Sequence, residues 1–339
     1  MPDLTAFISG LPKAELHVHH VGSASPAIVA DLAARYEGST SVSTDPQQLA
    51  EYFQFTDFGH FIEVYLSVVD LVRTPEDVHA LTLGVGRDMA AQNIRYAELT
   101  LTPYTSIVRG IAAEAFCEAV EDARLTLERE GGPVLRWIFD IPGECGVPSA
   151  DVTRDVALQQ RPDGLVGFGL GGPEVGVPRP QFAPHFAAAR AAGLHSVPHA
   201  GESTGPETVW DALRELGAER IGHGITAAQD PALLAHLAEH CIPLEISPTS
   251  NLRTRSVPSL EEHPLAVIAA AGVPFSVNSD DPPMFATDLG TEYAVAADLL
   301  GLDRDGVADL ARAAVRQSFL DDAGKRALLG EIDAYVASA

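Results

Sequence analysis

The chain has 339 residues, of which 46% are hydrophobic, and its formal net charge is −25. This content supplies a large core, and the length fits either two domains or one α/β barrel. The acidic surplus repels phosphate backbones and anionic membranes, so it argues against nucleic-acid partners and membrane-surface binding.

The cysteines and the N-terminus bear on the cellular compartment. Cys117, Cys145 and Cys241 lie far apart with no CxxC pair, which predicts free thiols in a reducing cytoplasm. The first fifteen residues lack a basic segment followed by an apolar run, so we expect no signal peptide. The longest apolar run, 264–277, is too short and interrupted to span a bilayer. We interpret it as a buried helix leading into a buried strand, and we expect a cytoplasmic protein.

Short β-rich runs alternate with helical patterns along almost the whole chain. Eight candidate strands lie at 15–19, 94–101, 134–140, 165–170, 194–199, 220–223, 242–247 and 274–279. Several are continuously apolar, which is typical of parallel strands covered on both faces. Helical patterns lie between them, such as 182–193, and 230–240 with Asp230 as N-cap. This alternation predicts a single (β/α)₈ barrel over residues 1–339, with a doubly wound sheet as the alternative.

Two regions exceed the strand–helix repeat. Residues 22–93 form an insert after the first strand, and residues 291–339 are expected to be helices covering one end of the barrel. Part of the insert is aromatic, with Tyr52, Phe53, Phe55, Phe58, Phe61 and Tyr65. These side chains either pack a helix onto the barrel or form a lid over its mouth, where loops build the site in this fold.

Polar residues with metal-binding chemistry stand at the ends of four candidate strands. The first strand ends in His17-Val18-His19, and residues two apart on a strand share a face. The fifth ends in His199, and Asp280 follows the eighth. In a barrel these ends converge on one mouth. Three imidazoles and one carboxylate suit Zn²⁺ or a similar first-row ion, so we predict His17, His19, His199 and Asp280 as metal ligands.

The neighbouring residues complete a hydrolytic site. A metal in this position would lower the pKa of a bound water towards about 7 and supply hydroxide at neutral pH. Glu202, three residues after His199, is placed to donate a proton to the leaving side of the substrate. His223, at the end of the sixth strand, could take the proton of the water or hold the hydroxide in position. Asp281 is free to hydrogen-bond to substrate.

Other motifs limit this interpretation. The stretch 167–176 contains GxGxxG but runs into Pro173 and Glu174, so it predicts the exit of the fourth strand and not a dinucleotide site. Two-metal barrel hydrolases commonly use a carboxylated lysine at the end of strand four. The only lysines are Lys13 and Lys325, so we predict one metal ion. We interpret His60, His79, His185, His195, His236, His240 and His263 as structural. The role of His20 stays open, because it follows His19 but points to the opposite face.

Eight runs together resemble the adenosine deaminase family within the amidohydrolase barrels. They are LPKAELHVH (11–19), YAELTLTP (96–103), GLGGPE (169–174), HAGE (199–202), RIGHG (220–224), ISPTSN (246–251), HPL (263–265) and NSDDP (278–282). The resemblance implies that the four predicted ligands bind zinc. It implies that Glu202 shuttles a proton to purine N1 and His223 orients the water, while Asp281 contacts N7 and the backbone at Gly172 faces N3. The implied reaction is hydrolytic removal of a purine 6-amino group with release of ammonia.

The chain departs from this family pattern at the first strand. Family members usually read HxHLDG, with the aspartate holding the ribose 5′-hydroxyl, whereas here Val21 takes that place; Thr100 stands where an arginine is common. The run HVHHVGS resembles the branch that deaminates 6-aminodeoxyfutalosine, a menaquinone-pathway intermediate with a carboxyphenyl-ketone tail at the 5′ position. Such a tail needs apolar packing from the insert and a cation, for which the candidates are Arg73, Arg253 and Arg255.

Two other functions remain open from sequence. One is adenosine or deoxyadenosine deamination in purine salvage. The other, from a different class, is a non-catalytic binding protein on a barrel scaffold. The second requires an incomplete metal site, yet every ligand type and Glu202 is present.

Overall fold

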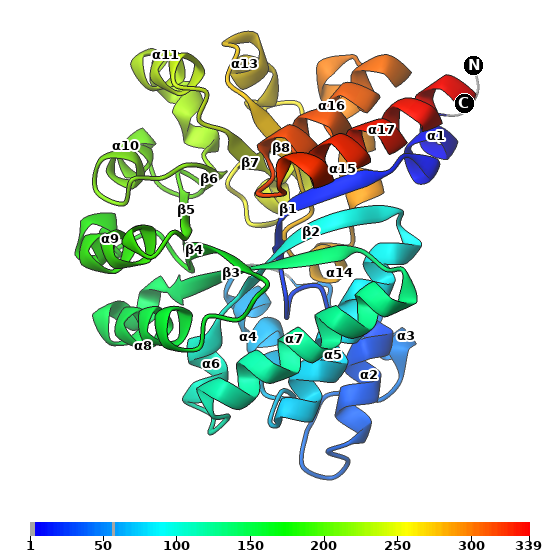
Figure 1. The fold of residues 1–339 in the computed structure, drawn as a ribbon, viewed down its shortest axis with the longest axis vertical. Helices are drawn as coiled ribbons and strands as arrows, with labels where there is room; N and C mark the ends of the chain where they lie inside the picture. Colours follow the sequence, from blue (N-terminus) through cyan, green and yellow to red (C-terminus); the bar gives the residue numbers. More distant parts are fainter. Residues whose placement is uncertain (1–3, 56–57) are drawn as a thin grey trace.

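The computed structural model describes residues 4–55 and 58–339, and the side chain of Phe58 lies outside the described part. Eight parallel strands follow one another in the order β1 to β8 (Figure 1). They are β1 (Lys13–His19), β2 (Ile94–Leu101), β3 (Val134–Pro142), β4 (Leu165–Gly171), β5 (His195–Ala200), β6 (Ile221–His223), β7 (Leu244–Ile246) and β8 (Phe275–Val277). All eight predicted strands are present, and β6 to β8 are shorter than expected.

The sheet closes on itself between β1 and the residues after β8. Val18 pairs in parallel with Asp280, the N–H of His19 donates to Asp280 O at 2.9 Å, and the N–H of Asp280 donates to His17 O at 3.2 Å. This seam confirms the predicted barrel and excludes the doubly wound sheet. The seam also places the predicted metal ligands His17 and His19 beside the predicted ligand Asp280.

The helices surround the barrel (Figure 1). In chain order they are α1 (Leu4–Gly10), α2 (Pro26–Ala34), α3 (Pro46–Tyr52), α4 (Phe58–Val69), α5 (Pro75–Ala91), α6 (Pro103–Ile107), α7 (Ala113–Glu130), η1 (Gly143–Cys145), α8 (Gly146–Gln159), η2 (Arg179–Phe182), α9 (Ala183–Ala191), α10 (Pro206–Arg214), η3 (Ile225–Gln229), α11 (Pro231–Glu239), α12 (Pro248–Arg253), α13 (Leu265–Ala270), α14 (Pro282–Phe285), α15 (Leu289–Leu300), α16 (Arg304–Gln317) and α17 (Asp322–Ser338). None of the helices in the described ranges is long and apolar enough to cross a membrane.

Local sequence signals explain several of these boundaries. The Asp230 carboxylate accepts from the N–H groups of Ala232 and Leu233, so it caps α11 as predicted, with Pro231 at the first helical position. The helix predicted at 182–193 is α9, preceded by the short η2 turn. The apolar run 264–277 forms α13 and then β8, as predicted, and buries Leu265 and Ile268.

The insert after β1 contains one ordinary barrel helix and three additional ones. Helix α5 packs against β2 and α7, whereas α2, α3 and α4 have no counterpart in the strand–helix repeat. Figure 1 shows these helices grouped on one side of the barrel. The rings of Phe55 and Phe61 lie 5.8 and 5.1 Å from that of Phe285 on α14. The insert therefore packs onto α14, after β8, so these aromatic residues anchor it to the barrel.

The C-terminal segment is helical, as predicted, and packs on the barrel strands. Helix α16 packs against β8 and β1, and α17 packs against α16. The hydroxyl of Tyr335 donates to Phe7 O at 2.9 Å, which joins α17 to α1 and brings the two ends of the chain together (Figure 1).

Candidate active site

The barrel brings the four predicted metal ligands into one buried cluster. His19 Nε2 lies 3.1 Å from Asp280 Oδ1 and 3.2 Å from His199 Nε2, and His17 Nε2 lies 3.6 Å from the same Asp280 oxygen. Ligands about 2.1 Å from a tetrahedral metal are about 3.4 Å apart. The three measured separations bracket that value, so the donor set fits a first-row ion.

The hydrogen bonding of the cluster supports the same conclusion. His17 Nε2 is buried and has no hydrogen-bond partner among the described residues, although it faces three other potential ligands. Burial favours the neutral form of His17, but Asp280 and Glu245 outweigh it and raise its pKa to about 10. The two carboxylates therefore favour positive charge at this place, which is the electrostatic condition for binding a cation.

A series of buried ion pairs orients the His17 ring from its Nδ1 side, opposite to the predicted metal position. Its Nδ1 lies 2.8 Å from Glu245 Oε2, which turns Nε2 towards the other ligands. The second Glu245 oxygen pairs with Arg220 Nε at 2.6 Å, and Arg220 also pairs with Glu98. The arginine of the RIGHG run thus neutralises two buried carboxylates, one of which holds a predicted metal ligand.

Backbone geometry at two site residues is unusual. His223 and Asp280 adopt φ of +60° and +67°, a left-handed conformation that is uncommon for residues other than glycine. Beside them, a Cβ at Gly222 would lie 2.7 Å from His17 Cε1 and 3.2 Å from His199 Cγ. The glycine of RIGHG therefore leaves the space that the imidazoles occupy.

Helix α12 and its C-cap supply partners to three site residues. Ser250 Oγ donates to Asp280 Oδ2 at 2.6 Å, and the Asn251 amide lies 3.1 Å from His223 Nδ1. The hydroxyl of Thr254 hydrogen-bonds to Glu202 Oε1 at 3.1 Å. The ISPTSN run therefore orients the predicted ligand Asp280 and His223, and Thr254, three residues after the run, orients Glu202.

Glu202 projects into the same space from the loop after β5. Its Oε2 lies 3.7 Å from His223 Nε2, and the side chain keeps 19% of its surface exposed. The loop is held by Glu174, whose carboxylate accepts from the N–H groups of Gly201, Glu202 and Ser203 at 2.6–2.9 Å. Burial alone would raise the pKa of Glu174, but these N–H groups and Arg179 lower it. Glu174 is thus an ionised anchor for the Glu202 backbone.

Two further predicted substrate contacts line the cluster. Asp281 is buried, and its Oδ1 has no hydrogen-bond partner among the described residues. Burial, and then the neighbouring Asp280 charge, raises the pKa of Asp281 to about 7, so it can donate or accept. Gly22 of the HVHHVGS run packs against it, since a Cβ there would lie 1.5 Å from Asp281 Oδ1. Gly172, after β4, adopts φ of +79°, a left-handed conformation that favours glycine, and a Cβ there would lie 2.2 Å from Glu144 Oε2.

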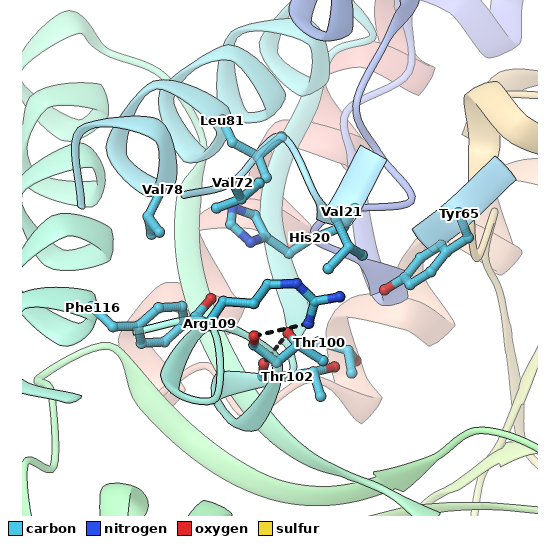
Figure 2. A pocket seen from close by; sticks show the side chains of 13 residues that line it. His20, Val21, Tyr65, Val72, Val78, Leu81, Thr100, Thr102, Arg109 and Phe116 are labelled. Carbon is cyan, nitrogen blue, oxygen red and sulfur yellow. Dashed lines mark hydrogen bonds between the residues drawn. The ribbon is translucent and has the colours of Figure 1, made fainter. Parts of the chain in front are cut away.

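A second hollow, which we name the Val21 pocket, lies beyond the cluster. Figure 2 shows it, and its walls include His20, Val21, Tyr65, Leu81, Arg109 and Phe116. Burial, reinforced by the charges of Asp281, Asp140 and Glu144, raises the pKa of Tyr65 well above its ordinary range. Tyr65 therefore lines the pocket and lies within the electrostatic range of Asp281. Val21, two residues after His19, links the pocket to the cluster along the chain.

His20 belongs to this pocket and not to the metal cluster. Its Nε2 lies 2.8 Å from Thr82 Oγ1 on α5, away from His17 and His19 as expected from its strand position. Burial lowers its pKa to about 4, so the ring is neutral. His20 is a wall residue that fixes α5 against the end of β1.

The arginine that lines the Val21 pocket differs from the three candidates chosen from sequence. Arg109 extends across the pocket between Phe116 and Tyr65 (Figure 2). Arg73 instead bonds to Ser39 and stacks on the Tyr36 ring.

The other two candidates also lie away from the pocket walls. Arg253 stacks on Phe55, 4.8 Å from the ring centroid, and Arg255 is exposed with φ of +62°. Thr100, at the position where the family often has arginine, is a further wall residue of the pocket.

Sequence reasoning missed the residues that support the site from behind. Glu174, Glu245, Asn251 and His263 were quoted only within runs or interpreted as structural, because no spacing rule joins residues so far apart. His263 does have its polar atoms satisfied, as expected, but one partner is Asn251 beside His223. Glu245 offered a signal, because it is a charged residue inside the otherwise apolar strand β7. Glu174 and His263 lie outside helices and strands, and Asn251 lies in a polar helix, so they offered no comparable signal.

Comparison with known proteins agrees with this geometry. The family profile described as adenosine deaminase matches residues 12–335. The aminodeoxyfutalosine deaminases of Streptomyces coelicolor and Streptomyces avermitilis are each 65% identical to the chain over 338 residues, covering 99% of it and 87% and 94% of their own lengths. The crystal structure of adenine deaminase from Arthrobacter aurescens is similar with a TM-score of 0.90 and 32% identity, over 97% of this chain and 100% of that one. The chain therefore belongs to the adenosine deaminase family.

Proposed function

We propose that the protein is a zinc-dependent hydrolytic deaminase that removes the 6-amino group of 6-aminodeoxyfutalosine in menaquinone biosynthesis, with one zinc ion per chain. The observation that carries the reaction type is a pair of overlapping ligand groups that share His17, one with His19 and Asp280 and the other with His199 and His223. Glu202 Oε2 lies 3.7 Å from His223 Nε2, beside these groups. The names of the two 65% identical relatives support the substrate.

In this proposal the four ligands hold the ion, which supplies Lewis acidity and lowers the pKa of a bound water. The Glu202 carboxyl, held from its backbone by Glu174, moves a proton to purine N1. His223 positions the attacking water oxygen for addition at C6. Glu202, deprotonated by its transfer to N1, takes a proton from this water and delivers it to the amino group. The C6–N bond then breaks, ammonia leaves, and the proton of the C6 hydroxyl returns to Glu202. Asp281, with its unpartnered oxygen, contacts N7, and the backbone at Gly172 faces N3.

The Val21 pocket supports a substrate with a 5′ tail. Val21 cannot accept a hydrogen bond from a 5′-hydroxyl, and apolar side chains continue beyond it to Phe116. Arg109 could bind the tail carboxylate, because its present partner Asp70 is 63% exposed and such surface pairs contribute only about 0–1 kcal/mol. The free volume is about 20 Å³, so the Arg109 side chain must move to admit an aromatic ring.

Ammonia release tests the proposed reaction. Purified protein should release ammonia from 6-aminodeoxyfutalosine, lose this activity after dialysis against a chelator, and regain it with one equivalent of Zn²⁺. Absence of ammonia release from the zinc-loaded protein would show that the substrate is a different one. Activity that survives complete removal of metal would contradict the metal role.

A further inference from the structure

A buried line of hydrogen bonds leads from the start of α13 to His223. The N–H of Leu265 donates to His263 Nδ1 at 3.1 Å, His263 Nε2 lies 3.1 Å from Asn251 Oδ1, and Asn251 Nδ2 lies 3.1 Å from His223 Nδ1. All three side chains are buried. The line reaches His223 from the side opposite to Glu202 and Asp280.

The first hydrogen bond fixes the direction of the whole line. A backbone N–H can only donate, so His263 Nδ1 must accept and carries no proton. Burial lowers the pKa of His263 to about 4, which leaves this ring neutral with its single proton on Nε2. That N–H requires an acceptor, so the Asn251 atom facing it is the carbonyl oxygen. The amide NH₂ of Asn251 therefore faces His223, and this orientation follows from the partners alone.

The same reasoning then applies to His223. Its Nδ1 receives an N–H from Asn251, so Nδ1 keeps its lone pair and a neutral ring carries its proton on Nε2. This Nε2 lies 3.7 Å from Glu202 Oε2 and 3.9 Å from Asp280 Oδ2, facing the metal cluster.

We propose that His263 and Asn251 are positioning residues that hold His223 as the Nε2–H tautomer, so that His223 donates a hydrogen bond to the attacking water oxygen and does not take its proton. This inference rests on the proposed function for the identity of the attacking group. It decides between the two roles that the sequence leaves open for His223. It also assigns the proton transfers to Glu202, which stands on the same side of the cluster.

The proton position can be measured directly by two-bond ¹H–¹⁵N NMR on the zinc-loaded, ¹⁵N-histidine-labelled protein. The His223 signals are those that disappear in His223→Gln. We expect a protonated Nε2 and a bare Nδ1 for His223, and the same pattern for His263. A proton on His223 Nδ1 would overturn the proposal. This readout needs no substrate, so failure to deaminate 6-aminodeoxyfutalosine would count against the proposed function and leave the tautomer result standing.

Substitutions test whether the line acts on the reaction. In His263→Gln the orientation of the Asn251 amide group is no longer fixed, so the Nδ1–H tautomer of His223 should become populated. We expect kcat to fall about 10²-fold, with KM nearly unchanged. The matched control is His185→Gln, because His185 is equally buried, at 4% against 5% exposed, but pairs with Asp151 on the barrel exterior. Equal losses in the two variants, or an unchanged His223 tautomer in His263→Gln, would overturn the positioning role.

The role of His223 as a donor has its own test. In His223→Gln the amide N–H replaces the Nε2 donor but cannot act as a base at neutral pH, whereas His223→Ala offers neither function. If His223 donates, Gln should retain at least about tenfold more kcat than Ala, roughly the contribution of one hydrogen bond. Equal activity of the two variants would instead indicate that His223 acts as a base.

Discussion

The two sides of the barrel mouth are built by different means. The metal side, formed by the ends of β1, β5, β6 and the residues after β8, holds His17, Asp280, His223 and the Glu202 backbone through directed hydrogen bonds from other residues. The Val21 pocket is lined by apolar side chains, most of them from α4 and α5, together with four hydroxyl side chains, Thr100, Thr102, Thr105 and Ser106. Its arginine pairs with an exposed aspartate.

The difference separates chemistry from specificity. Directed hydrogen bonds fix atoms to fractions of an ångström, which proton transfer and metal binding require. Apolar packing constrains shape and tolerates substitution of similar volume. We therefore expect changes on the metal side to lower kcat for every substrate, and changes in the Val21 pocket to alter which substrate is preferred.

The largest effect should come from Glu202→Gln. The backbone bonds to Glu174 remain, so the loop stays in place while the proton carrier is lost. We expect kcat to fall at least about 10³-fold with bound zinc unchanged, measured by ammonia release and atomic absorption. Turnover within tenfold of the wild type would remove the proton-shuttle role.

Glu245→Gln should weaken metal binding, although Glu245 is not a predicted ligand and acts only through His17. The amide oxygen can still accept from His17 Nδ1–H, but the negative charge behind the ligand is lost. Zinc affinity should fall about 10–100-fold in a competition with a chelating dye. Glu219→Gln is the control, because Glu219 pairs with His195 at the same 2.8 Å distance but on the surface. An equal change in both variants would argue against a specific effect at His17.

Val21→Asp should change which of the two substrates is preferred and should not lower the activity towards both. The carboxylate restores an acceptor for a 5′-hydroxyl, so the kcat/KM ratio of adenosine to 6-aminodeoxyfutalosine should rise about tenfold, the contribution of one hydrogen bond. Val21→Ala is the control, because it makes the side chain smaller without adding a hydrogen-bond acceptor. A ratio that stays constant in Val21→Asp, or moves equally in Val21→Ala, would mean that residue 21 does not mark the substrate.

Arg109→Gln should raise KM for the tailed substrate alone. Loss of a charge-assisted hydrogen bond to its carboxylate should raise KM roughly tenfold to 100-fold, with adenosine kinetics unchanged. Arg87→Gln is the matched control, since Arg87 forms a similar surface pair with Glu130. If both substrates respond equally, another cation holds the carboxylate, and Arg253 would be tested next.

The smallest effect concerns pH and stability. Burial lowers the pKa of His263 to about 4, below its unfolded value near 6.5, so between these values the unfolded chain binds more protons. Stability that His263 contributes above pH 6.5 should therefore be lost as the pH falls towards 4. The Tm of the wild type should drop a few degrees more over this interval than that of His263→Gln, measured by calorimetry. Parallel Tm curves would show that His263 titrates normally.

The sequence predicts the metal side well for a physical reason. A barrel brings all strand ends to one mouth, so His17, His19, His199 and Asp280 could be grouped from strand-end positions alone. The insert follows no such repeat. The contact of Phe55 and Phe61 with Phe285, and the position of Arg109 beside Val21, depend on how α4 and α5 pack, which local patterns do not specify.

Supporting residues are the second class that sequence patterns could not identify. The link from His263 through Asn251 to His223 joins three elements by side-chain hydrogen bonds and has no periodic signature. The same holds for Glu174 and the Glu202 loop. Such residues become visible only when three-dimensional contacts show which buried polar atoms satisfy one another.

The central claim is that Val21 and its pocket adapt a purine deaminase site to a substrate with a 5′ tail. The most direct test compares kcat/KM for 6-aminodeoxyfutalosine and for adenosine on the same zinc-loaded protein. The account predicts a preference of at least about 100-fold for the tailed substrate, the combined effect of roughly two lost or gained hydrogen bonds. Equal or better turnover of adenosine would contradict it, because another group would then have to hold the 5′-hydroxyl.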